Sequence, residues 1–146
     1  MPFVLPQADF CWFCRYLAGE ADCAFVARND EVAAWVNIRQ YERGAVLIAP
    51  VAHLPTVFDL DEPTLAAVYA EAARIGRAAV KAFGAIGLNI YQNNGTAAGQ
   101  SIPHHHVHVV PRYPSSDPRR LFREKDFEAV SWKAQLEVAD AIRAAL

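Results

Sequence analysis

Four of the five histidines of this chain lie within the segment SIPHHHVHVVPRY, residues 101–113, and this run restricts the possible folds more than any other feature. Because side chains alternate between the two faces of a β-strand, a strand over residues 104–110 places His104, His106 and His108 on one face. Three imidazoles are unfavourable on a buried face unless partners satisfy them. That face is therefore expected to be either a functional site or a surface in contact with water.

The opposite face of the same strand carries Val107 and Val109, which suit a buried surface beneath a helix. His105 lies among these valines. We expect His105 either half-exposed at the start of the strand or hydrogen-bonded to a backbone carbonyl beneath the helix, and we assign it no catalytic role.

Three explanations compete for the histidine run: a metal site, a catalytic site, or an accidental run such as a tag remnant. The run is internal and framed by Gln100-Ser101 and Pro111-Arg112, which disfavours a tag remnant. Alternate residues on one face of a strand lie about 6.5–7 Å apart, which is wide for three neighbouring ligands of one small metal. This spacing favours a row of groups along a substrate, where one group attacks and another assists.

The remainder of the chain predicts an α+β fold. Short apolar or β-branched stretches bounded by turn residues predict strands, and an Ala-rich stretch predicts a long helix. We predict strands at residues 23–28, 32–38, 45–50, 87–92 and 104–110, and helices at residues 65–83 and 127–146. This order predicts a sheet of about five mostly antiparallel strands, with one long helix across a face and a C-terminal helix.

The long helix has recognisable start and stop signals. Asp59 and Asp61 offer N-cap oxygens, Pro63 suits the first turn, and Gly84 suits the end. Apolar residues at three- and four-residue steps give the helix one apolar face. They are Leu65, Val68, Ala72, Ile75, Ala79 and Phe83.

Length and composition suit one domain over residues 1–146, with 53% hydrophobic and 21% charged residues. The net charge of about −2 gives no basic field that would favour nucleic acid or an anionic membrane as a partner. No apolar run approaches the roughly 18 residues of a membrane span, and the first ten residues lack the pattern of a secretory signal. We therefore expect a cytoplasmic protein with reduced cysteines.

The segment PHHHVHVVPR resembles the histidine triad motif, His-φ-His-φ-His-φ-φ with φ apolar, and so resembles the histidine triad family. His104, His106 and His108 fill its three histidine positions, whereas His105 departs from the motif because it occupies an apolar position. The segment from Gly99 to Ser101 is similar to the family's lead-in.

The loop Asn93-Asn94-Gly95 is also similar to the family, and the resemblance extends over residues 11–112. Residues 113–146 would then form a C-terminal extension. The resemblance further implies the family's fold and a homodimer that pairs through the long helix and an edge strand.

The resemblance implies a hydrolase or transferase that acts at the α-phosphate of a purine nucleotide conjugate, such as a phosphoramidate or a dinucleoside polyphosphate. It assigns His106 as the nucleophile that forms a nucleotidyl-histidine intermediate, a role that a neutral imidazole can fill at pH 7. It assigns proton donation to His108 and a hydroxyl near the leaving group to Ser101. The further nucleotide-binding positions that it implies are Asn37, Asn93, Gly99 and Gln100.

Other residues near these positions have two interpretations each. Asn37 either lines the nucleotide site or caps the end of the predicted hairpin. Phe10, Phe13 and Phe25 either wall a base pocket by stacking or pack in the core. The arginines that follow the triad either reach phosphates or belong to a solvated basic loop: Arg112, Arg119 and Arg120.

Cys11 and Cys14 have C-x₂-C spacing, which by itself is consistent with zinc or with a redox pair. Family branches with this N-terminal pair bind zinc through the two cysteines, a later histidine and the first triad histidine. The resemblance therefore implies a structural zinc site of Cys11, Cys14, His53 and His104. A reduced cysteine pair beside a hydrogen-bonded His53 is the alternative, and Cys23 is expected in the core.

Two functions other than catalysis remain open. The chain could be a zinc-containing module that binds or senses nucleotides with little turnover, although its complete triad disfavours this. It could also be a zinc protein whose histidines are mainly ligands, which metal analysis of a His106 variant would reveal.

Overall fold

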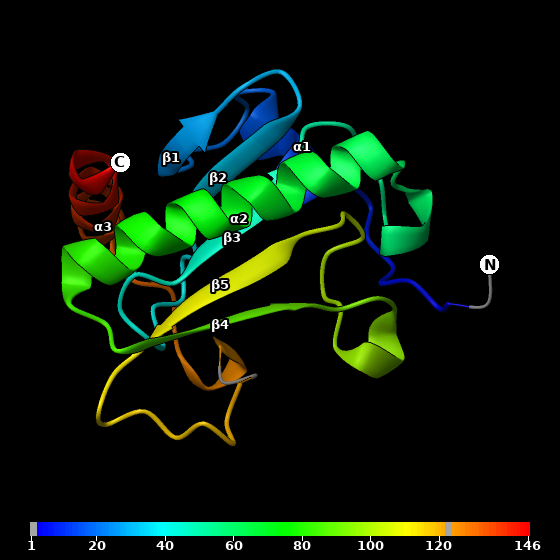
Figure 1. The fold of residues 1–146 in the computed structure, drawn as a ribbon. Helices are drawn as coiled ribbons and strands as arrows, with labels where there is room; N and C mark the ends of the chain where they lie inside the picture. Colours follow the sequence, from blue (N-terminus) through cyan, green and yellow to red (C-terminus); the bar gives the residue numbers. More distant parts are fainter. Residues whose placement is uncertain (1–2, 122–123) are drawn as a thin grey trace.

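The computed structural model describes residues 3–121 and 124–146, which form a five-stranded antiparallel sheet with helices on both faces (Figure 1). Residues 1–2 and 122–123 of the predicted single domain lie outside the described residues. The elements in chain order are α1 (Trp12–Leu17), β1 (Phe25–Arg28), β2 (Val32–Val36), β3 (Val46–Pro50), η1 (Val57–Asp59), α2 (Glu62–Phe83), β4 (Gly87–Gln92), η2 (Thr96–Ala98), β5 (Val107–Arg112), η3 (Glu124–Asp126) and α3 (Trp132–Ala145).

The predicted α+β class is confirmed. The strands lie in the order β1-β2-β3-β5-β4, and every neighbouring pair is antiparallel. The expected hairpin joins β1 to β2, the apolar run of residues 45–50 forms the central strand β3, and β4 matches its predicted range at both ends. β4 ends the sheet, so one of its edges has no strand partner among the described residues.

The histidine strand begins later than predicted, because β5 starts at Val107 and the first three histidines precede it. Their backbone groups bond outside the β3–β5 ladder. The N–H of His104 donates to the carbonyl of Ile102 at 2.8 Å, and the N–H of His105 donates to that of Leu54 at 2.7 Å. Only His108 therefore sits on the ladder, opposite Leu47.

The start and stop signals of the long helix at Asp61, Pro63 and Gly84 are confirmed, and the helix begins at Glu62, three residues before its predicted start. Asp59 instead belongs to η1, where its carboxylate accepts the N–H of Thr56 at 2.8 Å. Asp61 caps α2 by accepting the N–H of Thr64 at 2.9 Å, and Gly84 ends it with φ +66°. The helix packs closely on the sheet at Gly76, where a Cβ atom would lie 2.8 Å from a methyl of Leu88. Of the predicted apolar face, four residues are buried: Val68, Ala72, Ile75 and Ala79.

The C-terminal helix starts at Trp132, five residues after its predicted start at residue 127. Ser131 caps it by accepting the N–H of Ala134 at 3.1 Å. The preceding residues are drawn into other contacts, because the N–H of Val130 donates to the carbonyl of Ile38 at 2.8 Å and Phe127 packs near Tyr41.

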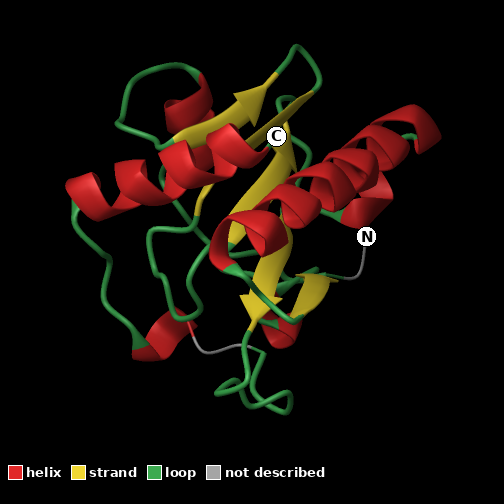
Figure 2. Ribbon diagram, turned by 60° about the vertical axis from the view of Figure 1, so that its left-hand side comes forward, coloured by secondary structure: helices red, strands yellow, loops and turns green. Residues whose placement is uncertain are grey.

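The two faces of the sheet carry different layers. α2 and α3 lie side by side on one face (Figure 2), where Val138, Ala139 and Ile142 of α3 join the larger hydrophobic core. On the other face, the short helix α1, which was not predicted, packs Phe13 and Leu17 against β2 and β3. The rest of that second face is open to a cavity. No helix in the described ranges has the length and apolar character that a membrane span requires.

Both expectations for His105 are wrong. Its side chain is fully buried, and neither ring nitrogen has a hydrogen-bond partner among the described residues. Burial, and to a lesser degree neighbouring His104, lowers the pKa of His105 to about 4, so the ring is neutral at pH 7. A buried polar group without a partner is destabilising.

Replacing His105 by leucine is expected to raise the free energy of unfolding by about 1 kcal/mol, because it removes two unsatisfied polar atoms at similar volume. Urea unfolding followed by circular dichroism measures the change. His105→Ala is the control and should destabilise the protein, because it leaves a cavity. A less stable His105→Leu protein would contradict the absence of partners for this ring.

Candidate functional site

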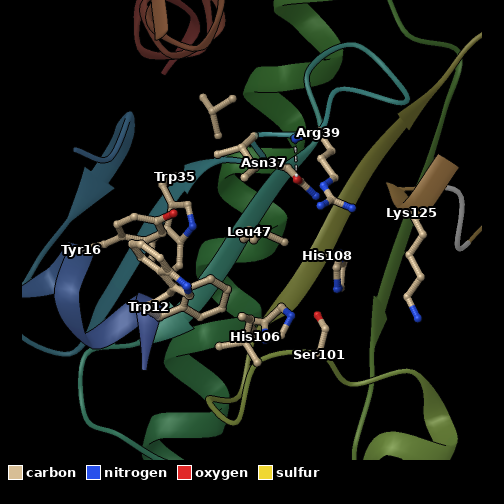
Figure 3. A pocket seen from close by; sticks show the side chains of 14 residues that line it. Trp12, Tyr16, Trp35, Asn37, Arg39, Leu47, Ser101, His106, His108 and Lys125 are labelled. Carbon is tan, nitrogen blue, oxygen red and sulfur yellow. Dashed lines mark hydrogen bonds between the residues drawn. The ribbon is translucent and has the colours of Figure 1, made fainter. Parts of the chain in front are cut away.

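A cavity of about 500 Å³ opens on the sheet face that carries α1, a size that suits a small ligand (Figure 3). Its floor comes from β2, β3 and β5, and α1 and the loop before β5 form its sides. The lining residues are Trp12, Phe13, Tyr16, Trp35, Val36, Asn37, Ile38, Arg39, Leu47, Ser101, Ile102, His106, His108 and Lys125.

His106 has a defined tautomer. Its Nδ1 lies 2.7 Å from the backbone oxygen of His104, and since a carbonyl oxygen only accepts, Nδ1 carries the hydrogen. The lone pair is then on Nε2. Burial lowers the pKa of His106 to about 4. The imidazole is therefore neutral and nucleophilic at physiological pH. The edge of Phe13 packs against it, with ring centroids 4.9 Å apart.

His108 lies beside His106, with ring centroids 5.0 Å apart. Tyr91 of β4 stacks on it at 4.4 Å with the rings 7° from parallel. The hydroxyl of Tyr91 is 3.0 Å from that of Tyr41, which helps to hold the stacked pair in place. Burial lowers the pKa of His108 to about 3, so it too is neutral. Ser101 is exposed and its hydroxyl points toward the two histidines (Figure 3).

Both interpretations of Asn37 describe part of its environment. Its Oδ1 accepts the N–H of Arg39 at 3.0 Å, which closes a turn after β2. The same side chain is buried and lines the cavity. Asn37 thus both closes a local turn and presents a polar side chain to the cavity.

The loop residues implied as nucleotide-binding do not line the cavity. Gln100 is buried, and its amide binds backbone groups: it accepts the N–H of Gly95 at 2.7 Å and donates to the carbonyls of Pro55 and Ile102. Asn93 is buried near Gly99, whose φ is +88°. These residues hold the shape of the loop that presents Ser101.

The aromatic wall of the cavity differs from the expected one. Phe13 lines the cavity, but Phe10 and Phe25 do not. Instead Trp12, Tyr16 and Trp35 line it, and Trp12 is 44% exposed. A helical reading of residues 12–17 would have identified two of them, because positions i and i+4 share a helix face.

The arginines after the triad do not line the cavity either. Arg112 is buried and donates to the carbonyls of Asp117 and Arg120. The side chains of Arg119 and Arg120 are exposed and pair with Asp117. The cations that do line the cavity are Arg39 and Lys125, which the sequence did not single out.

The second cluster is formed by Cys11, Cys14, His53 and His104, whose ligand atoms all lie within 4.8 Å of one another. The Nδ1 of His104 is 3.5 Å from the sulfur of Cys11 and 3.6 Å from that of Cys14, and the Nδ1 of His53 is 3.3 Å from the sulfur of Cys14. A tetrahedral zinc separates sulfur and nitrogen ligands by about 3.6 Å, given its usual bond lengths. This group can therefore hold a metal.

The hydrogen bonds of His104 also suit a role as a metal ligand. Its Nε2 lies 2.8 Å from the carbonyl oxygen of Pro50 and so donates to it, which leaves the Nδ1 lone pair facing the two sulfurs. The N–H of Cys14 donates to the sulfur of Cys11 at 3.4 Å. Burial and then the neighbouring Cys11 raise the pKa of Cys14 to about 11.

Cys23 is partly buried beside the smaller core around Trp35, away from this cluster. Burial raises its pKa to about 12, so the thiol is protonated and unreactive.

Comparison with known proteins identifies relatives along most of the chain. Residues 18–115 match the HIT domain. The chain is 36% identical over 110 residues to Protein hit of Bacillus subtilis, covering 75% of this chain and 76% of that protein. It is 35% identical over 102 residues to adenylylsulfatase HINT3 of Arabidopsis thaliana, covering 70% of this chain but 52% of the plant protein. It is 28% identical over 102 residues to adenosine 5′-monophosphoramidase hnt1 of Schizosaccharomyces pombe, covering 70% of this chain and 74% of the yeast protein.

Solved structures of similar proteins have the same fold as this chain. A HIT-like protein from Bartonella henselae superposes with a TM-score of 0.84 at 27% identity, covering 96% of this chain and 99% of that one. A zinc-bound histidine triad family protein from Mycobacterium smegmatis superposes with a TM-score of 0.79 at 31% identity, covering 92% and 91%. The arrangement of the three histidines, the fold and these similarities together establish that the chain belongs to the histidine triad (HIT) family.

Proposed function

We propose that this protein hydrolyses or transfers the nucleotidyl group of purine nucleotide conjugates, with His106 as the nucleophile at the α-phosphorus. The observation that carries the proposal is the hydrogen bond from His106 Nδ1 to the carbonyl of His104, because it leaves the Nε2 lone pair available for attack. The cavity beside it has an aromatic wall that suits a stacked base.

The reaction would proceed in two steps. Nε2 of His106 forms a bond to the α-phosphorus while the bond from phosphorus to the leaving group breaks, and the leaving group departs with the electron pair. Water or another acceptor hydroxyl then attacks the phosphorus and releases its proton to the solvent, the phosphorus–nitrogen bond breaks with its electron pair returning to Nε2, and the nucleotide product keeps the incoming oxygen. His106 keeps its Nδ1 hydrogen throughout, and its bond to the His104 carbonyl stabilises the positive charge of the adduct.

Ser101 and His108 lie where they could assist the leaving group. Both line the cavity beside His106, and both carry a group able to donate a hydrogen. Asn37, at the far end of β2, offers a polar contact for the sugar. Hydrolase names among the relatives support nucleotide-conjugate chemistry: one is an adenylylsulfatase and one an adenosine 5′-monophosphoramidase.

We also propose that the group of Cys11, Cys14, His53 and His104 holds a structural zinc. Four protein ligands would leave no open position, which is typical of structural sites. The zinc-bound histidine triad protein from Mycobacterium smegmatis supports this choice of metal. Bound there, zinc would tie α1 to the triad and orient His104. The proposal includes a reducing compartment such as the cytoplasm, because the cysteines bind metal as free thiolates.

Two features support a homodimer through β4 and α2. An edge strand with exposed apolar side chains is a site for pairing with a second chain. Ile90 of β4 is 40% exposed and Tyr69 of α2 is 41% exposed. A shallow groove beside Tyr69 is lined by Leu65 and Ala66 of the same helix.

Replacing His106 by alanine is expected to lower kcat/KM by at least about 10³-fold, because the variant lacks the attacking nitrogen. A screen of adenosine and guanosine conjugates measures turnover, and mass spectrometry of quenched wild-type reactions detects the nucleotidyl adduct. An adduct that persists in His106→Ala would contradict the assignment. Nucleotide affinity without turnover in the wild type would favour a sensing module.

Purified protein is expected to contain about one zinc per chain by plasma mass spectrometry. Cys14→Ser should lose most of it, since a hydroxyl is a poor zinc ligand. His106→Ala is the matched control, because it changes a triad histidine outside the four-residue group, and it should retain the metal. Loss of zinc in His106→Ala would place that residue among the ligands.

The wild type is expected to have twice the mass of a single chain by light scattering, and Ile90→Lys to be monomeric, because a charge at the edge strand opposes pairing. Ile86→Lys is a useful comparison, since Ile86 is 72% exposed but precedes β4. A dimeric Ile90→Lys protein would rule out this interface.

A further inference from the structure

The charge around the cavity is of one sign. Among the described residues that line it, Arg39 and Lys125 are the charged side chains, and none is a carboxylate. These two side chains are therefore the charged groups that a ligand in the cavity would meet among the described residues.

The two cations serve different parts of the cavity (Figure 3). Arg39 lies next to Asn37, at the end of β2. Lys125 comes from η3 in the C-terminal extension, and its side chain extends past His108 toward the level of Ser101. The aromatic wall of Trp12 and Tyr16 lies at the opposite side. A ligand whose base rests on that wall and whose α-phosphorus faces His106 would direct its leaving group toward the ammonium of Lys125.

The segment that carries Lys125 is attached to the sheet on both sides. Before it, Arg112 of β5 donates to the carbonyls of Asp117 and Arg120, at 3.2 Å for the latter, and the hydroxyl of Tyr91 donates to that of Leu121 at 3.4 Å. Tyr91 is also the residue that stacks on His108.

After Lys125, the chain is again held against the sheet side of the cavity. Phe127 packs beside Tyr41, and the N–H of Val130 donates to the carbonyl of Ile38 at 2.8 Å. Ile38 itself lines the cavity. These attachments keep the extension at the mouth of the cavity, so the position of Lys125 follows from the fold.

We propose that Lys125 is the specificity residue for the leaving group and selects nucleotide conjugates whose leaving group is an anionic oxygen acid, such as phosphate, polyphosphate or sulfate. This inference rests on the proposed function. As the bond from phosphorus to oxygen breaks, the electron pair moves onto the leaving oxygen, and a nearby ammonium stabilises that charge. An amine leaving group must instead gain a proton, which a neighbouring cation disfavours. Lys125 therefore accelerates the first class and not the second.

The test compares kcat/KM of wild type and Lys125→Gln for two conjugates of one nucleoside. Adenosine 5′-phosphosulfate releases an anionic oxygen acid, whereas adenosine 5′-phosphoramidate releases an amine. Lys125→Gln is expected to lower kcat/KM about tenfold or more for the phosphosulfate, the range of one charged hydrogen bond, and less than twofold for the phosphoramidate. Lys125→Arg should keep most of the activity on both.

Lys133→Gln is the matched control, because Lys133 is an exposed lysine like Lys125 but lies on α3, outside the cavity. This variant should change kcat/KM by less than twofold for each of the two conjugates. The inference is overturned if Lys125→Gln affects both conjugates equally or neither. Equal losses would mean that Lys125 contacts the α-phosphate or supports the extension.

Failure of the proposed function is a separate outcome, seen as no wild-type turnover of either conjugate. In that case, the role of Lys125 can still be tested by measuring nucleotide affinities with calorimetry. Wild type should bind ADP more tightly than AMP, and Lys125→Gln should lose most of that preference while its affinity for AMP stays within twofold. An unchanged preference in Lys125→Gln would overturn the inference without reference to catalysis.

Discussion

His104 connects the two clusters of this protein, and the geometry of the site depends on it. Its side chain donates to the carbonyl of Pro50 and directs the other ring nitrogen at two cysteine sulfurs. Its backbone carbonyl accepts from Nδ1 of His106. One residue thereby joins the N-terminal helix, the end of the central strand and His106, the proposed nucleophile. Any shift of α1 relative to β3 would be transmitted to His106 through a single peptide unit.

One face of the sheet carries the larger hydrophobic core, and the other face carries the cavity. The larger core lies beneath α2 and α3, where valines and isoleucines of four strands alternate with residues of the other face. The second face is covered by α1 only in part, which leaves the cavity. The histidines of this face are buried and neutral, so they need no counter-charge, and Lys125 is exposed at the rim of the cavity.

Local signals predicted most of the fold but only part of the site. The Gly84 stop of α2 and the turn residues around β4 act within a few residues, so the end of α2 and both ends of β4 were predicted accurately, whereas α2 starts three residues before its predicted start. The histidine run was assigned to the strand too early, because its first backbone groups bond to Leu54 and to other residues outside the ladder. Such partners are set by tertiary structure, and alternation along a strand cannot reveal them.

The same limit explains the burial of His105 and the missed cations. The sequence suggested exposure or a carbonyl partner for His105, whereas the chain path before β5 buries its ring without one. Lys125 lies in an extension that the family motif does not reach, and nothing in its neighbours indicates the cavity. Its placement depends on contacts with residues far away in sequence, including Arg112 and Tyr91.

In the proposed function, neutral histidines and the cations of the cavity would let one triad act on different conjugates. A neutral imidazole would attack phosphorus without first losing a proton, whichever group departs. Residues around the leaving group would then discriminate between conjugates. These residues come from the loop before β5 and from the C-terminal extension. Because the extension lies outside the triad and its lead-in, it can vary in length and charge while the nucleophile stays unchanged. In the proposed function, substrate choice is thus separable from chemistry in structural terms, because the carbonyl of His104 orients His106 whereas the C-terminal extension positions Lys125.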